Sequence, residues 1–241
     1  MAEFAWKVRK GSGVRRFSDG LVIQGRREGA LDLWICRLGE GKPPPRELSS
    51  LVPLVAACVS EGIRRDTGVV SWLHWPNLVT VGGRVVGMAS VSSREAPGRD
   101  AGMVFAVSVD CFSGVPLGFP PGLPKTSIRG ELGVEVDLGL LREKILHAVD
   151  WYYAEWAAGR RSKMVARIVP TISWMGSEVE ARVVGGGVLR GRAACLDDDG
   201  SLVLEVPRLR GLETTTLGPG DVELVLQYGE RPARRGAHFY Q

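Results

Sequence analysis

The feature that most constrains the fold of this chain is a series of short β-branched and aromatic runs, each closed off by glycine or proline. Runs bounded in this way are typical of β-strands. The first half of the chain holds five of them, at 21–24, 30–38, 69–75, 79–91 and 103–112. Inside the fourth run, the pair Gly82-Gly83 separates two apolar stretches and predicts a tight β-hairpin.

Two stretches have the period of a helix instead. Residues 47–65 carry one apolar stripe, and a second stripe covers about 138–158. The second stretch follows Asp137, which suits a helix N-cap, and it ends before Gly159. Because strands dominate the first part and the helices are few, we expect an α+β fold, with a mixed or antiparallel sheet covered by helices on one face.

The pattern changes after Ser177, where four short strands are predicted at 179–184, 188–196, 202–206 and 222–226. A hairpin meander of about fifty residues leaves too much edge and face exposed as an open sheet, so we expect a small closed β-barrel. We therefore divide the chain into a larger N-terminal domain at 1–175, a barrel domain at 176–230 and a basic tail at 231–241.

Positive charge is concentrated at the N-terminus. Residues 1–27 hold seven basic and two acidic side chains, a net charge of +5, whereas the whole chain of 241 residues has +4. Such a segment indicates an anionic ligand, either a nucleic acid or a small phosphate compound, or else a solvated basic tail. The aromatic residues beside these charges, Phe4, Trp6 and Phe17, are too few to form a stacking surface, which argues against nucleic acid.

Several functional classes are disfavoured. The four cysteines lack metal or redox spacing, no phosphate-loop or nucleophile-elbow motif occurs, and the three histidines have no helical i, i+4 partner. The run Asp197-Asp198-Asp199 precedes a glycine and is better explained as a turn than as a metal site. We expect no metal held by protein ligands. The chain also lacks a signal-peptide pattern and any apolar run near 18 residues, so a cytoplasmic protein without a membrane span is expected.

The most specific string is Leu73-His74-Trp75-Pro76-Asn77, followed by Gly82-Gly83-Arg84-Val85-Val86-Gly87. It resembles the Lys-Trp-Pro-Asn-Asp corner of biotin protein ligases and the lysine and glycine that follow it. The segment 124–138 and the final meander also resemble that family, the meander its SH3-like C-terminal domain. Upstream, residues 21–30 look like a shortened version of the family's glutamine strand and Gly-Arg-rich adenylate loop.

The resemblance implies a class II synthetase-like core that joins biotin to ATP and passes the biotinyl group to a lysine of a biotin carboxyl carrier protein. Mg²⁺ would accompany the nucleotide, and a homodimer is compatible, since some relatives pair through their sheets. Two anions must meet in this reaction, so cations are needed. We assign this catalytic role to Arg26, Arg27 and Arg84. The ligand-binding residues implied are Gln24, Gly25, Trp75, Asn77, Gly87 and Asp110.

This sequence also departs from the family pattern. The adenylate loop is short, Leu78 replaces the acid of the corner, and Arg84 stands where the family has lysine. The family's glycine-rich strand ending in asparagine is here Ala106 to Asp110, whose added side chains would fill part of a biotin-sized pocket. Two alternatives therefore stay open. Trp75 is either a pocket residue or a core residue, and the chain is either an active ligase or a ligase-like module that binds a ligand or a partner protein without turnover.

Overall fold

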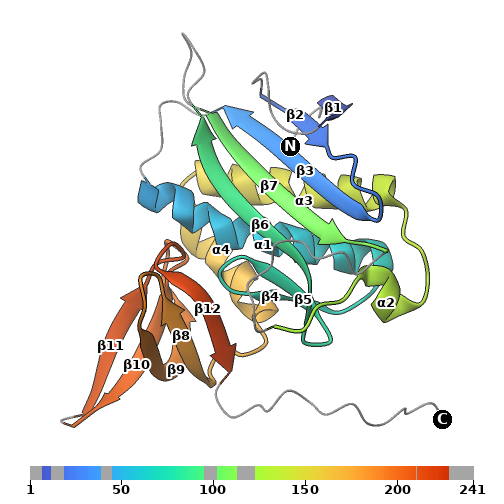
Figure 1. Cartoon of the computed structure of the whole chain (residues 1–241). Coiled ribbons are helices and arrows are strands. Elements are labelled where there is room, and N and C mark those ends of the chain that lie inside the picture. Colours follow the sequence, from blue (N-terminus) through green and yellow to red (C-terminus); the bar gives the residue numbers. More distant parts are fainter. Residues whose placement is uncertain are drawn as a thin grey trace.

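The structure is a computed structural model, and it describes residues 7–11, 19–38, 45–94, 102–112, 123–209 and 211–227. The aromatic residues of the basic N-terminal segment and the expected tail at 231–241 lie outside these ranges. The described part forms a larger α+β body and a smaller C-terminal β domain (Figure 1).

A seven-stranded mixed sheet forms the centre of the larger body, with the strand order β1-β2-β3-β7-β6-β5-β4. Strands β1 and β2 are parallel, and the other neighbours are antiparallel. The predicted hairpin between β5 and β6 is confirmed, since Gly82 and Gly83 form its turn with φ values of +56° and +73°. The strands are β1 (Lys7–Lys10), β2 (Leu21–Gln24), β3 (Ala30–Leu38), β4 (Ser71–His74), β5 (Leu78–Val81), β6 (Arg84–Arg94) and β7 (Gly102–Asp110).

Helices α1 (Pro45–Thr67) and α3 (Leu138–Ala157) pack against each other behind one face of this sheet (Figure 1). The predicted N-cap is confirmed, because Asp137 Oδ1 accepts hydrogen bonds from the backbone N–H groups of Gly139 (2.7 Å) and Leu140 (3.2 Å). Three further elements are α2 (Ile128–Leu132), α4 (Arg161–Ile168) and the 3₁₀ turn η1 (Val169–Thr171). The α+β fold with helices on one face is therefore confirmed.

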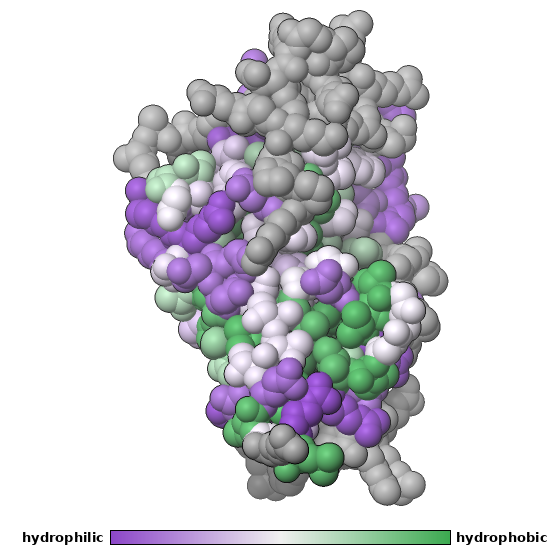
Figure 2. Space-filling model, turned by 90° about the vertical axis from the view of Figure 1, so that its left-hand side faces the viewer, coloured by the Kyte–Doolittle hydropathy of each residue, from purple (hydrophilic) through white to green (hydrophobic). Residues whose placement is uncertain are grey.

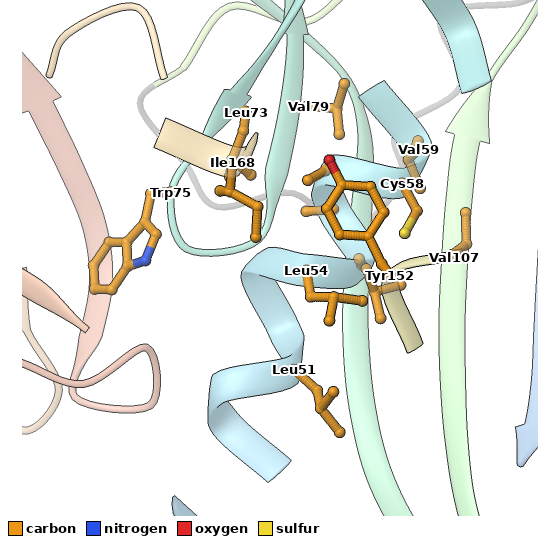
Figure 3. Packing of buried hydrophobic residues seen from close by; sticks show 14 of the residues in the cluster. Leu51, Leu54, Cys58, Val59, Leu73, Trp75, Val79, Val107, Tyr152 and Ile168 are labelled. Atoms are coloured by element: carbon orange, nitrogen blue, oxygen red, sulfur yellow. The ribbon is translucent and has the colours of Figure 1, made fainter. Parts of the chain in front are cut away.

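The main core lies between the sheet and the helices, where Leu54, Cys58 and Tyr152 of α1 and α3 meet Val79 and Val107 of the sheet (Figure 3). Strand β3 shows how the two faces of the sheet are separated. Leu31, Leu33 and Ile35 join this core, whereas the alternate residues Asp32, Trp34 and Cys36 lie on the face that the helices leave open. This open face carries a small buried cluster of its own, made of Leu21, Ile23, Cys36 and Val104.

The C-terminal domain is one five-stranded antiparallel sheet in the order β11-β10-β9-β8-β12. Within the described residues its end strands β11 and β12 do not pair with each other. Figure 2 shows hydrophobic side chains on the lower half of one face of the molecule, where this domain lies; its exposed large apolar residues are Val184, Val188, Leu209 and Leu212. The strands are β8 (Glu178–Val183), β9 (Val188–Leu196), β10 (Leu202–Arg208), β11 (Gly211–Leu217) and β12 (Val222–Gln227).

No helix among the described residues is long and apolar enough to cross a membrane.

Candidate active site

The strand register assembles a row of residues across the open face at one end of the large sheet. Asp32 of β3 lies opposite Ser108 of β7, and Ser108 lies opposite Met88 of β6. On the other side of Asp32, the backbone N–H of Gly25 donates to the Asp32 carbonyl at 2.8 Å. Gly25, Asp32, Ser108 and Met88 therefore follow one another across four neighbouring chain segments, which come from distant parts of the sequence.

A polar network occupies the centre of this row. Asp32 Oδ1 accepts a hydrogen bond from Ser108 Oγ at 2.6 Å, and it also pairs with the Arg27 guanidinium. Asp32 is 8% exposed, so this carboxylate needs such donors. Gly25 allows the chain to pass close by, since a Cβ at this position would be 2.7 Å from the Asp32 Cβ. Arg27 and Gly25 are both predicted site residues, and both contact Asp32, which was not predicted.

Asp32 was not predicted as a site residue, although the sequence carries a signal for it. Residues 30–38 alternate strictly between core and open face once they form a strand, and this period places Asp32 and Trp34 together on the open face. A carboxylate on the non-core side of a strand next to the Arg26-Arg27 loop is a natural partner for that loop.

Arg84 begins β6 and is held by a different carboxylate. Its Nη2 donates to Glu131 Oε2 of α2 at 2.6 Å, and its side chain is about half exposed. The loop after β2 and the turn before β6 lie at the same end of the sheet, because Ala30 pairs with Asp110 and Gly87 pairs with Val109. Strands β3 and β7 separate them, a distance of about 14 Å at the usual strand spacing. Arg27 and Arg84 therefore flank this end of the sheet, and each forms an ion pair with a different carboxylate, Asp32 and Glu131 respectively. Arg26 is exposed.

Two predicted residues have partners that explain them without a ligand. Gln24 Oε1 accepts a hydrogen bond from Arg142 Nη1 of α3 at 2.8 Å, so its amide turns toward the helices. Gly87 is buried, and a Cβ there would lie 3.0 Å from the Ser108 carbonyl oxygen. Close approach of β6 to β7 therefore already requires a glycine at this position.

The two remaining predicted residues lie on different elements, Asn77 in the turn between β4 and β5 and Asp110 at the end of β7. Asn77 is half-buried, and its backbone carbonyl accepts a hydrogen bond from the Ala89 N–H at 2.9 Å. Asp110 is 2% exposed and ends β7, two residues beyond Ser108. Alternation along the strand places Asp110 on the same face as Ser108 and Asp32. The site end of the sheet thus carries two buried carboxylates as well as its arginines.

Trp75 lies at the junction between the two domains. It is fully buried, and its indole N–H donates to the Gly200 carbonyl of the C-terminal domain at 3.0 Å. Figure 3 shows the Trp75 side chain apart from the other labelled core residues, toward the C-terminal domain. Its neighbour His74 lies 2.6 Å, by Nε2, from the Val225 carbonyl oxygen. These contacts are those of a buried residue at the domain junction, and the ligand-binding role of Trp75 stays a prediction.

Burial controls the chemistry of the thiol near the site. It raises the pKa of the Cys111 thiol to about 12, and the carboxylates of Asp110 and Asp32 act in the same direction. Cys111 follows directly on β7 but is therefore not a nucleophile at neutral pH. Among the residues that the structure describes, no group of three or more His, Cys, Asp or Glu side chains could hold a metal ion.

Comparison with solved structures shows that this fold is similar to that of known biotin protein ligases. The chain is similar to biotin protein ligase from Aquifex aeolicus, with a TM-score of 0.68 and 17% identity over 87% of this chain and 89% of that one. The same enzyme in complex with biotin and ATP gives a TM-score of 0.67 and 18% identity, covering 88% and 91% of the two chains. The chain has the fold of the biotin protein ligases, including their C-terminal β domain.

A further structural relative is a biotin protein ligase-like protein of unknown function from Silicibacter sp. TM1040. It gives a TM-score of 0.68 and 16% identity, covering 89% of this chain and 95% of that one. No protein-family model matches the chain, and no curated sequence matches it.

Proposed function

We propose that this protein is a biotin protein ligase-like enzyme that activates biotin with ATP and transfers it to a lysine of a biotin carboxyl carrier protein. The observation that carries the proposal is the fold, which extends over nearly the whole of both chains and is shared with a ligase that binds biotin and ATP. We place the reaction in the cytoplasm, and self-association of the enzyme belongs to the same proposal.

In the first step, a biotin carboxylate oxygen attacks the α-phosphorus of ATP and pyrophosphate leaves, which yields biotinyl-AMP. In the second, the neutral amine of a carrier lysine attacks the acyl carbon, AMP leaves, and the amine proton is lost to solvent. Arg27 and Arg84 flank the site end of the sheet, and they would offset the charge of carboxylate and phosphates. Mg²⁺ would arrive as the ATP complex, coordinated mainly through phosphate oxygens.

The second candidate is a ligase-like module that binds a ligand without turnover. It is favoured by the occupied open face, where Asp32 engages Arg27 and Ser108, and by the buried carboxylate of Asp110 beside them. In that case the ligand binds, but no adenylate forms.

Biotin-dependent exchange of labelled pyrophosphate into ATP separates the two candidates. Under the first, exchange occurs, and Arg84→Ala abolishes it with the fold intact. Arg208→Ala is the matched control, because Arg208 is a similarly exposed arginine that pairs with a glutamate, Glu213, at 2.8 Å in the C-terminal domain. Normal exchange in Arg84→Ala would contradict the role of Arg84. Absent exchange with a clear thermal shift supports the second candidate, since biotin at 100 times its Kd stabilises a fold by about 2.7 kcal/mol.

A further inference from the structure

The short helix α2 holds one carboxylate, that of Glu131, beside the start of β6. Its first residues are fixed by Ser127, whose Oγ accepts from the Gly130 N–H at 3.0 Å. The segment before α2 is tied to β6 by two backbone hydrogen bonds, Val85 N–H to the Pro124 carbonyl (2.8 Å) and Thr126 N–H to the Val85 carbonyl (3.0 Å). Glu131 is therefore attached firmly to the strand that carries Arg84.

The two oxygens of Glu131 have different surroundings. Oε2 accepts the Arg84 hydrogen bond at 2.6 Å, whereas Oε1 is buried and has no hydrogen-bond partner among the described residues. The side chain as a whole is 11% exposed. A buried carboxylate oxygen without a donor is costly, and proteins tolerate such a group chiefly where a ligand or water completes it. Oε1 can therefore still accept a hydrogen bond from a ligand.

The negative charge of Glu131 restricts which group of a ligand can donate a hydrogen bond to Oε1. A phosphate or carboxylate of the substrates would be repelled by Glu131, so within the nucleotide Oε1 must face a neutral part that carries hydroxyl or N–H groups. Within the proposed reaction we assign Arg84 to the α-phosphate, and the ribose is joined to that phosphate by one CH₂–O link. Carboxylates accept hydrogen bonds from ribose hydroxyls in other nucleotide sites.

We propose that Glu131 binds a ribose hydroxyl of the nucleotide through Oε1 while it orients Arg84 through Oε2. The inference rests on the proposed adenylation reaction and adds to it a residue that recognises the sugar. Glu131 would then distinguish ATP from nucleotides that lack the ribose hydroxyls, and it would hold the guanidinium toward the phosphate.

The test compares ATP with 2′,3′-dideoxy-ATP in the parent protein and in Glu131→Ala, by nucleotide affinity in calorimetry and by biotin-dependent pyrophosphate exchange. In the parent, loss of a hydrogen bond to a charged group should weaken the dideoxy nucleotide by about tenfold to a hundredfold. In Glu131→Ala this ratio should fall to near one. Glu131→Gln keeps the size of the side chain and removes its charge, so it should reduce the ratio in part. Glu213→Ala, which removes an exposed carboxylate paired with Arg208, should keep the parental ratio.

The outcomes separate the inference from the function on which it rests. Exchange in the parent with an undiminished ratio in both Glu131 variants overturns the role of Glu131 and leaves the ligase proposal standing. A parent that neither binds ATP nor exchanges pyrophosphate overturns both.

Discussion

The indole N–H of Trp75 donates a hydrogen bond to the backbone carbonyl of Gly200, across the junction between the two domains. The strand that ends at this corner is β4, an edge strand of the large sheet, and Gly200 lies in the turn between β9 and β10. The string that resembles the ligase corner therefore has a structural role here, because it attaches the C-terminal domain to the edge of the large sheet.

Trp75→Phe should lower the free energy of unfolding by about 1–3 kcal/mol, because the Gly200 carbonyl would lose its buried donor. Urea unfolding followed by circular dichroism measures the change. Trp174→Phe is the matched control: Trp174 is also buried, but its indole nitrogen has no hydrogen-bond partner among the described residues. Equal losses in the two variants would show that the Trp75 hydrogen bond contributes little.

Acid should weaken the same junction through His74. Burial lowers the pKa of His74 below its usual 6.5, although the hydrogen bond to the Val225 carbonyl opposes this shift. The unfolded chain then binds more protons than the folded one as the pH falls below about 6.5, so stability should decrease there. In His74→Gln this part of the pH dependence should disappear. Unfolding free energies measured between pH 5 and 7.5 provide the test, and an identical slope in both proteins would refute it.

Local periodicity was sufficient to predict the long helices and most strands. The stripe at 138–158 and the N-cap Asp137 need no knowledge of distant residues, and the Gly82-Gly83 turn follows from backbone freedom alone. Strands β1 and β11 and the short helices α2 and α4 were not predicted, because the two strands are largely polar and the two helices are too short to show a clear apolar stripe.

The site was predicted less completely because it depends on register. Asp32 and Ser108 are 76 residues apart, and only the pairing of β3 with β7 makes them neighbours. Similarly, nothing in the local sequence shows that Glu131 approaches Arg84, since α2 is attached to β6 through the segment 124–126. For Trp75, a motif that resembles a ligand site could not reveal that a second domain covers it.

The cysteines should differ sharply in reactivity. Cys36, Cys58 and Cys111 are buried, and burial raises the pKa of the Cys58 and Cys111 thiols, whereas Cys195 is exposed. Because the thiolate is the reactive form, a disulfide reagent such as Ellman's at pH 8 should label about one thiol per native chain. All four should react in guanidinium chloride. Cys195→Ser should leave almost no fast reaction in the native protein, and rapid labelling of that variant would mean that a buried thiol becomes accessible.

Gly25 offers a test of how tightly the site end of the sheet is packed. A Cβ at this position would lie 2.7 Å from the Asp32 Cβ, so Gly25→Ala must displace Asp32 or the loop that carries Arg27. We expect a loss of about 1–3 kcal/mol in unfolding free energy, as overpacking usually causes. Gly220→Ala is the control, since its Cβ would lie at an ordinary 3.7 Å from the Ser49 Cβ.

The same pair of variants connects packing with ligand binding. If Arg27 and Asp32 border the biotin or nucleotide site, Gly25→Ala should also weaken the thermal shift produced by biotin and ATP at concentrations at which the variant is still fully folded. Gly220→Ala should keep the parental shift, because Gly220 lies beside α1 at the domain junction. An unchanged ligand response in a destabilised Gly25→Ala would place the substrates elsewhere on the sheet, away from the Arg27, Asp32 and Ser108 network.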